Sequence, residues 1–345
     1  KSRRIVLRNN GIKQRYYALD KDGNYTHTNA EIAAQSIRKL MDNDPAKLKE
    51  IDLLTCGTSV PDQLMPSHGV MVHGELPESN AIEVITNSGN CCSGMHGLKF
   101  AYMSIKTGDA KKAVCNASER LSRSLHADQF ELEAKKMEEL EENPYIAFEK
   151  DFLRWMLSDG AASFLLEGEK SKDGISLRID WIEGYSFANE IESCMYMGTE
   201  KLADGTMKSF KDYKQSEVQE QSIMSIKQDT KLLGENIVKL GFKKLEGAIK
   251  DKGMTADDIT FFLPHMSSYF FESKIADTLD QLDMHIPKER WFSNLETTGN
   301  VGSVSIFLMV DELMNSGKLK VGDKILLAVP ESARFSYVFS LLTVC

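Results

Sequence analysis

The chain alternates short apolar runs with longer segments of helical character, and this alternation constrains its fold more than any other feature. Residues 51–56 and 81–86 are apolar runs of strand length, and 113–117 is another. Between the last two, residues 92–106 carry apolar side chains at helical spacing, and Gly108 follows as a C-cap. This βαβ pattern predicts an α/β fold, a mostly parallel sheet with helices on its faces.

The length of 345 residues is enough for about two ordinary domains. We predict one domain over 1–170 and a second over 171–345, whose long helix spans about 231–252. An acidic helical segment at about 124–150 reads as an insertion into the first domain. Its sequence fits a cap over an active site, a dimer element or a solvent-facing insertion equally well.

Composition excludes several classes of function. The net charge of −9 argues against a nucleic-acid partner, because binding phosphates needs a surplus of Lys and Arg. No apolar run approaches the about 20 residues of a membrane span, and no secretory signal opens the chain as given. The six cysteines lack Cys-x-x-Cys spacing, so we expect reduced thiols in a cytoplasmic protein, with neither zinc nor disulfides.

The strongest local signal is Asn-Ser-Gly-Asn-Cys-Cys-Ser-Gly-Met at residues 87–95, which we call the elbow. An apolar strand enters a tight turn there, and a helix starts at Cys92. Unpaired N–H groups and the helix dipole at that position favour a thiolate, so we expect a lowered pKa and a nucleophile. Cys91 precedes the helix and reads as a packed small residue. The alternative to a catalytic Cys92 is that both Cys91 and Cys92 are buried core residues.

Two further segments end in polar side chains. The apolar run 259–264 is followed by His265, at the carboxyl end of a predicted strand, where ligand sites of open α/β sheets gather. Asn300 lies between glycines at the start of another predicted helix. Each also has a simpler interpretation. His265 could be a core histidine whose hydrogen-bonding groups are paired, and Asn300 could be a turn residue.

Together these motifs resemble the β-ketoacyl-acyl-carrier-protein synthase III family of the thiolase-like superfamily. The family's Ala-Cys-Ala/Ser-Gly, Pro-His and Gly-Asn segments correspond to residues 91–94, 264–268 and 299–305. Weaker matches occur at 11–15, 66–67 and 159–161, so the resemblance spans nearly the whole chain. The family's first strand and nucleotide-contacting Trp have no counterpart, and we expect that the chain as given starts late.

The resemblance implies a site and its chemistry. Cys92 would take an acyl group from coenzyme A or an acyl carrier protein, whose phosphopantetheine thioesters are the substrates. His265 and Asn300 would hydrogen-bond the carbonyl of a malonyl or β-ketoacyl thioester as it becomes a carbanion. Backbone N–H groups of Cys92 and near Ala333 and Arg334 would hold the second oxyanion. No metal or organic cofactor is required.

The resemblance also implies an architecture. Two similar halves would stack as five layers, α-β-α-β-α, and form a homodimer. Met65 would then reach toward the neighbour's acyl pocket. Residues 195–197, Met-Tyr-Met, read either as the lining of a long-chain tunnel or as simple core residues.

Two departures from the family pattern stand out. Residues 330–336, Pro-Glu-Ser-Ala-Arg-Phe-Ser, replace a Gly-Gly-Gly-Phe loop. Arg334 would either form an outward ion pair with Glu331 or bind a polar second substrate. Glu119, after the strand at 113–117, aligns with an acidic family position and is a candidate base or supporting group.

The resemblance therefore predicts a ketosynthase that forms a carbon–carbon bond by Claisen condensation. The departures suggest a branch in secondary metabolism, similar to the dialkylresorcinol-forming ketosynthases, in which ring closure follows. An acyltransferase acting on an alcohol or amine, and a catalytically silent acyl-binding subunit, are the alternatives. A papain-type hydrolase shares the order Cys, His, Asn but not the local Cys-Gly-Ser-Cys-Trp pattern.

Overall fold

Each half of the chain builds one four-stranded sheet. The computed structural model describes residues 2–125, 153–172 and 174–345. The first sheet has the order β2 (Glu83–Ser88), β1 (Leu53–Thr58), β3 (Lys112–Glu119), β4 (Gly160–Glu167). The second has the order β10 (Phe261–Pro264), β11 (Lys324–Glu331), β12 (Ser336–Val344), β5 (Leu177–Ser186).

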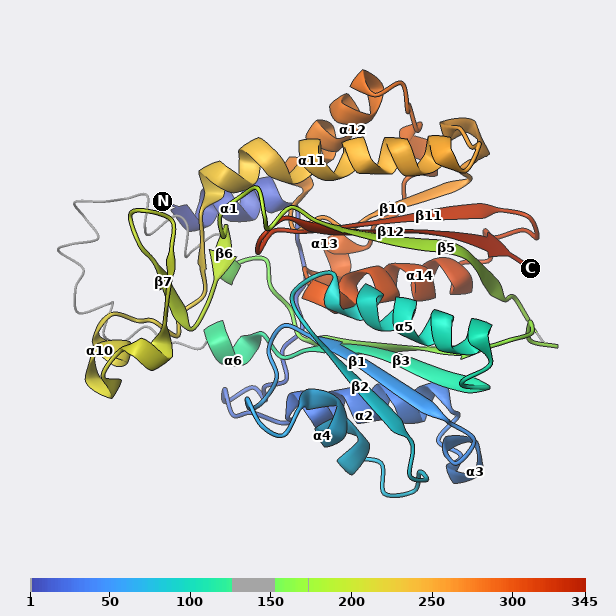
Figure 1. Ribbon diagram of the computed structural model, residues 1–345, viewed down its shortest axis with the longest axis horizontal. Helices are drawn as coiled ribbons and strands as arrows, with labels where there is room; N and C mark the ends of the chain where they lie inside the picture. The colour runs from blue at the N-terminus through green and yellow to red at the C-terminus, as the bar shows by residue number, and fades with distance from the viewer. Residues whose placement is uncertain (1, 126–152, 173) are drawn as a thin grey trace.

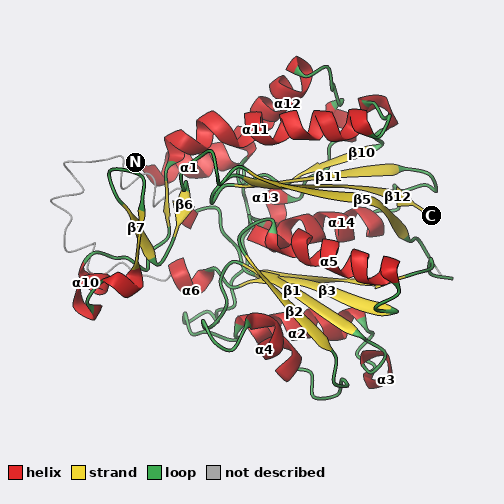
Figure 2. Ribbon diagram, in the orientation of Figure 1, coloured by secondary structure: helices red, strands yellow, loops and turns green. Residues whose placement is uncertain are grey.

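Helices cover both faces of both sheets and give five layers, as expected (Figures 1 and 2). The middle layer holds α5 (Ser93–Thr107) and α14 (Ser305–Asn315), each of which contacts strands of both sheets. The outer layers hold α2 (Asn29–Leu40) with α4 (His68–Gly74), and α11 (Thr230–Asp251) with α12 (Glu272–Gln281). The remaining α-helices are short: α1 (Ser2–Asn10), α3 (Pro45–Leu48), α6 (Ser122–Leu125), α10 (Gln215–Glu220) and α13 (Leu295–Thr298).

The two sheets share a three-strand pattern and differ at the fourth strand, because β2 is parallel to β1 whereas β5 is antiparallel to β12. In the first, β1 and β3 are parallel and β4 is antiparallel to β3. In the second, β10 and β11 are parallel and β12 is antiparallel to β11. This repetition is the similarity of halves that the sequence predicted. The predicted boundary at residue 170 falls between β4 and β5, and the acidic insertion lies almost wholly outside the described residues.

The elements around the elbow follow the sequence pattern closely. Helix α5 ends at Gly108, which adopts the expected left-handed conformation with φ of 80°. At the other end of the helix, a Cβ on Gly57 of β1 would lie 2.5 Å from the backbone N of Gly94, so helix and strand touch directly. Strand β2 begins and ends two residues later than predicted, because Asn87 and Ser88 still pair with β1 despite their polarity.

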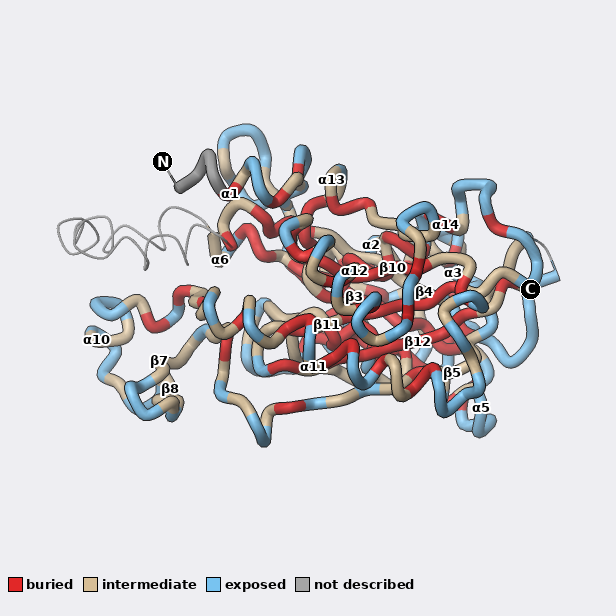
Figure 3. The backbone as a smooth tube through the Cα atoms, turned by 90° about the horizontal axis from the view of Figure 1, so that it is seen from above, coloured by how far each residue is buried: buried red, intermediate tan, exposed pale blue. Residues whose placement is uncertain are grey.

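Residues 195–228 form an extension at one end of the molecule. It contains β6 (Met195–Tyr196) paired with β9 (Lys227–Gln228), and β7 (Thr199–Lys201) paired with β8 (Met207–Ser209). Figure 3 shows buried residues concentrated along the two sheets and exposed ones around α10. No helix in the described ranges is both long and apolar enough to cross a membrane.

Candidate active site

A cavity of about 490 Å³ opens where the ends of the two sheets meet the extension. Its apolar wall includes residues of α11, such as Leu233 and Ile237, and Phe271 before α12. The Met-Tyr-Met segment 195–197 also lines it, as the tunnel interpretation predicted. Among the described residues of this wall there is no Lys, Arg, Asp or Glu. The cavity is therefore suited to an uncharged, largely apolar ligand.

The elbow places its two cysteines differently from expectation. Cys91 lies in the cavity wall with Gly89 and Asn90, whereas it was expected to be packed. Cys92 directly precedes α5, is only 1% exposed, and its Sγ donates a hydrogen bond of 3.2 Å to the carbonyl of Val329. The thiol that the motif identifies as the nucleophile is thus the more deeply buried of the two.

The pKa of the Cys92 thiol is raised, which corrects the expectation of a lowered value. Burial is the largest cause, and the negative charge of Glu331 adds to it. The same two causes raise the pKa of Cys91. The backbone groups that would favour a thiolate are already engaged, because Cys92 N–H donates to Glu331 Oε2 over 2.9 Å. Both cysteines are therefore thiols at neutral pH.

Glu331 is the residue that the sequence interpretation misplaced. It ends β11, is 8% exposed, and accepts a second hydrogen bond of 3.1 Å from Asn90 N–H. Its carboxylate points into the elbow rather than outward to Arg334. The signal that could have located it is the buried apolar run 325–329, since the strand continues for two more residues beyond this run and Glu331 is buried again.

Ala333 and Arg334 do not lie in the described wall of the cavity. Arg334 Nε donates instead to the carbonyl of Ile191, and the Ala333 carbonyl accepts the N–H groups of Cys194 and Met195. The turn after β11 points these residues toward the extension, which corrects their assignment to substrate binding. The other predicted oxyanion donor, the Cys92 N–H, donates to Glu331 in this structure, and its role toward an oxyanion stays a prediction.

His265 and Asn300 both lie in the cavity wall, as predicted. His265 follows β10 and is held by its N–H, which donates to Ala328 O over 2.8 Å. Burial lowers the pKa of its ring to about 4, so it is neutral at pH 7. Its Nδ1 is buried without a hydrogen-bond partner among the described residues, which leaves Nε2 as the ring nitrogen able to reach a ligand.

Asn300 presents its amide in a fixed orientation. Its Oδ1 accepts a hydrogen bond of 3.0 Å from Gly302 N–H, so the amide nitrogen is directed away from that contact. Its backbone N–H donates to Met156 O over 2.8 Å. An imidazole and a carboxamide in one cavity wall can both donate hydrogen bonds to a carbonyl oxygen.

Glu119 lies behind the cavity wall rather than in it. Its carboxylate is fully buried and accepts hydrogen bonds from Ser59 and Ser303, each through backbone N–H and hydroxyl. Ser59 follows β1, and Ser303 belongs to the 3₁₀ turn Gly302–Val304, so Glu119 joins the two halves beside Asn300. Burial outweighs these hydrogen bonds and raises its pKa to about 7.

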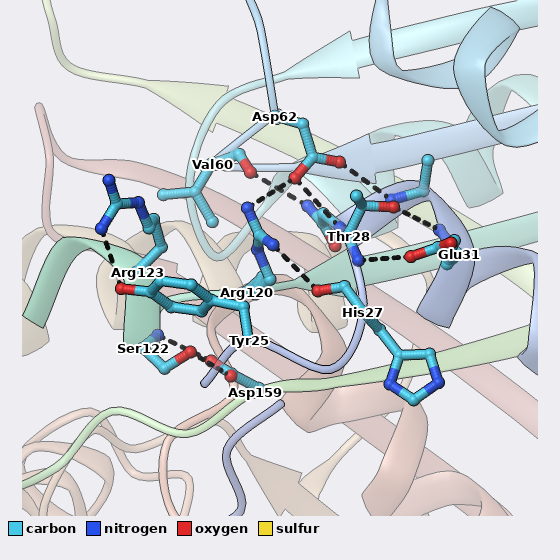
Figure 4. Close-up of polar contacts among 12 residues, drawn as sticks. Tyr25, His27, Thr28, Glu31, Val60, Asp62, Arg120, Ser122, Arg123 and Asp159 are labelled. Carbon is cyan, nitrogen blue, oxygen red and sulfur yellow. Dashed lines mark hydrogen bonds and ion pairs between the residues drawn. The ribbon is translucent and has the colours of Figure 1, made fainter. Parts of the chain in front are cut away.

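A polar network holds the loop after β1 in place (Figure 4). Arg120 forms an ion pair of 2.9 Å with Asp62 and donates to the carbonyl of His27. Asp62 in turn accepts the N–H groups of Asn29 and Ala30 at the start of α2. This loop carries Ser59, the hydrogen-bond donor to Glu119, into the cavity wall.

Met65 lies outside this cavity. Its side chain is 85% exposed on the loop before α4. No partner chain is present to test its expected reach into a neighbour, so this role and the homodimer stay predictions.

Comparisons with known proteins agree with one another. Residues 249–330 match the family described as 3-oxoacyl-acyl-carrier-protein (ACP) synthase III, C terminal. A β-ketoacyl-acyl-carrier-protein synthase III of Clostridium perfringens is 23% identical over 317 residues, covering 92% of this chain and 83% of the relative.

Solved structures show the same fold. A tetronic acid condensing enzyme, AbyA1, superposes with a TM-score of 0.74 at 18% identity, over 96% of this chain and 88% of the other. OleA of Xanthomonas campestris, solved with lauric acid and lauroyl-CoA, gives 0.73 at 19% identity, over 98% and 88%.

Proposed function

We propose that the chain is a member of the β-ketoacyl-acyl-carrier-protein synthase III family, whose C-terminal model matches residues 249–330, and that it is a ketosynthase joining two acyl units by Claisen condensation. The observation that carries the proposal is that Cys91 of the elbow, His265 and Asn300 line one largely apolar cavity, and that Cys92 directly follows Cys91 at the start of α5. The cavity of about 490 Å³ lies in the ~300–1,000 Å³ range of small-molecule sites. That space suits an acyl chain or a phosphopantetheine arm.

The first half-reaction loads the enzyme. The sulfur of Cys92 attacks the thioester carbonyl of an acyl-coenzyme A or acyl carrier protein, and the carrier leaves as a thiol with the proton that Cys92 gives up. Because burial and Glu331 keep Cys92 protonated at rest, loading requires that this proton be transferred as the carbon–sulfur bond forms. The acyl chain then occupies the apolar part of the cavity.

The second half-reaction forms the carbon–carbon bond. A malonyl thioester becomes a carbanion by losing carbon dioxide, and a β-ketoacyl thioester by losing a proton to a base. In both cases negative charge grows on the thioester oxygen. Neutral His265 and Asn300 donate hydrogen bonds to that oxygen, which is more effective in a buried wall than in water. The carbanion attacks the Cys92 thioester, and the cysteine leaves.

Intact-protein mass spectrometry tests this function directly. Wild type, Cys92→Ala and Cys91→Ala are incubated with a panel of acyl-coenzyme A and acyl-carrier-protein thioesters. We expect a gain of one acyl group in wild type and Cys91→Ala, and none in Cys92→Ala. Malonyl or β-ketoacyl thioester added to the acylated protein should then release a condensed product.

The controls separate the alternatives. An adduct lost only in Cys91→Ala would move the nucleophile to the cysteine that lines the cavity and disprove the assignment of Cys92. An acyl group released only to an alcohol or amine would indicate an acyltransferase. No adduct with any donor would contradict the proposed function and favour an acyl-binding subunit.

A further inference from the structure

The cavity continues as an apolar branch along α11. Four residues on one face of this helix line it, at spacings of four, one and four, and so extend it over about 13 Å of the helix axis. With two residues from the α12 side they form a set that we call the α11 branch: Leu233, Ile237, Val238, Phe242, Phe271 and Ile275. Within the described ranges, neither α11 nor α12 adds a polar side chain to the wall. A phosphopantetheine arm would bury its amides there without partners, so the branch suits an alkyl chain.

The ring of Phe242 closes this branch. Phe242 is fully buried, and it is the last residue of α11 in the described wall. Its ring packs edge-on against Phe262 and Phe339, at centroid distances of 6.5 and 6.4 Å. Both of those rings are fully buried outside the described wall, and the same holds for Leu245 on the next turn of the helix. Phe242 therefore separates the branch from the packed core.

The backbone next to this ring is held against the second sheet, along which α11 lies (Figure 1). A Cβ on Gly241 would lie 2.1 Å from the ring of Tyr337, so the helix backbone already touches that ring. One turn earlier, the Tyr337 hydroxyl donates to the carbonyl of Ile237 over 3.0 Å. Because two successive turns of α11 are fixed to β12, the ring of Phe242 has little freedom to retreat from the cavity.

The α11 branch begins close to the elbow. The thiol of Cys92 donates its hydrogen bond to β11 one residue before Pro330. Pro330 lines the cavity and pairs with Tyr337, which binds Ile237 of the branch. Because Cys91, Pro330 and Ile237 line one cavity, an acyl chain that starts at the elbow can pass into the branch.

The position of the Phe242 ring sets a length. Phe262, against which this ring packs, lies three residues before His265, which corresponds to about 10 Å along β10. An extended alkyl chain advances by about 1.3 Å for each carbon–carbon bond of about 1.5 Å. The space between the polar wall at His265 and the ring of Phe242 thus has the length of about eight carbons.

We propose that Phe242 limits the length of the acyl chain that Cys92 accepts, and that the acyl donor is a medium-chain thioester of about eight carbons. The inference rests on the proposed loading of Cys92 and specifies its substrate. A longer chain would have to displace a ring packed among buried neighbours, and such overpacking is costly. A shorter chain buries fewer CH₂ groups and forgoes ~4-fold in binding for each of them.

Loading rates across chain lengths test the inference. Wild type, Phe242→Ala, Phe242→Leu and Val238→Phe are incubated with straight-chain acyl-coenzyme A thioesters of even length, from acetyl to palmitoyl. Intact mass follows acylation over time. Each rate is divided by the rate of the same variant with acetyl-coenzyme A, so that a general loss of folded protein cancels. In wild type, the relative rate should rise with chain length and then fall by at least ~10-fold within about two further carbons.

The variants should move this fall in opposite directions. Phe242→Ala and Phe242→Leu remove or shrink the ring, so the fall should shift by about two carbons or more toward longer chains. Val238 lines the branch one turn, about 6 Å, before Phe242, so Val238→Phe should shift the fall toward shorter chains. Ile37→Ala is the matched control. Ile37 is fully buried on α2 in a separate core cluster, so its variant should keep the wild-type profile.

The inference is overturned if the Phe242 variants are acylated with the wild-type length profile. If neither of them is acylated by acetyl-coenzyme A, Val238→Phe decides, and an unchanged profile there overturns the inference. It also fails if the Phe242 variants change only the preferred chain of the condensing donor, because the branch would then hold the second substrate. A length profile that ignores Phe242 leaves the proposed function standing. If wild type is acylated by no donor, the proposed function fails and this inference falls with it.

Discussion

At the scale of single residues, burial competes with hydrogen bonding at Glu119. Hydrogen bonds from the backbone N–H and hydroxyl groups of Ser59 and Ser303 favour its charged form, and complete removal from water favours the neutral one. Burial wins, and the pKa rises from 4.5 to about 7. Glu119 therefore binds a proton more tightly in the folded protein than in the unfolded chain.

This difference makes stability depend on pH. Because the folded pKa is above the unfolded one, the contribution of Glu119 is fully present below pH 4.5 and is lost as pH rises to about 7. Glu119→Gln cannot titrate. Urea unfolding is measured for both proteins at pH 5, 6, 7 and 8. Between pH 5 and pH 8, wild type should lose about 2–3 kcal/mol of unfolding free energy relative to Glu119→Gln. A difference that stays constant across this range would show that Glu119 is already ionised when folded.

The sequence predicted where His265 and Asn300 lie better than it predicted the electrostatics of the elbow. Cys92, His265 and Asn300 were recognisable because each follows a strand-like run or opens a helix. The thiol pKa was predicted with the wrong sign, because helix position alone suggests free N–H groups at the elbow. Their occupation by Glu331 depends on a contact across 239 residues of chain, which no local pattern contains.

At the scale of elements, α11 depends on a glycine that faces β12. Tyr337 is fully buried against the helix, and its hydroxyl donates to the carbonyl of Ile237 over 3.0 Å. A Cβ on Gly241 would lie 2.1 Å from the Tyr337 ring. The helix can approach the sheet this closely only because residue 241 has no side chain.

Two glycines of the same helix give a matched test. Gly241→Ala should lower the free energy of unfolding by about 2 kcal/mol or more, since overpacking forces α11 away from β12. Gly247 has no atom within 4 Å of its would-be Cβ, so Gly247→Ala should instead stabilise by ~0.5–1 kcal/mol through helix propensity. Urea unfolding of both variants measures the difference. Equal effects in the two variants would mean that the Tyr337 contact does not limit packing.

Long elements were predictable, and the extension was not. Helices α5 and α11 carry apolar side chains at regular spacing over four turns or more, and their predicted limits differ from the observed ones by one residue. Strands β6 to β9 are two or three residues long, too short for any periodicity. Their pairing depends on tertiary contacts. The sequence therefore left two interpretations of residues 195–197 open, the lining of a tunnel or simple core residues.

At the scale of the whole molecule, the candidate site is built by both halves together. Glu119 of the first half binds Ser303 of the second, and Glu331 of the second binds the elbow of the first. Neither half alone would hold the Glu119 and Glu331 carboxylates in these positions. Activity should therefore require that the two sheets stay packed across the middle layer.

One aromatic pair spans that layer. Phe307 of α14 is fully buried and stacks on Phe164 of β4, with ring centroids 4.2 Å apart and an interplanar angle of 6°. Since α14 also packs against β10, the pair connects the first sheet to the second through one helix. Loss of the pair should weaken the contact between the halves rather than either sheet alone.

A double-mutant cycle tests this connection. Phe307→Ala should cost ~3–5 kcal/mol because it leaves a cavity in the middle layer. The control is Phe270→Ala, which should cost less than about 1 kcal/mol because half of the Phe270 surface already lies in water. The double variant Phe307→Ala/Phe164→Ala should lose less unfolding free energy than the sum of the two single losses. The shortfall should be ~0.5–1.5 kcal/mol, the usual energy of an aromatic pair. Additive losses would show that the stacked rings do not couple the halves, and the common site would then depend on the Glu119 and Glu331 contacts alone.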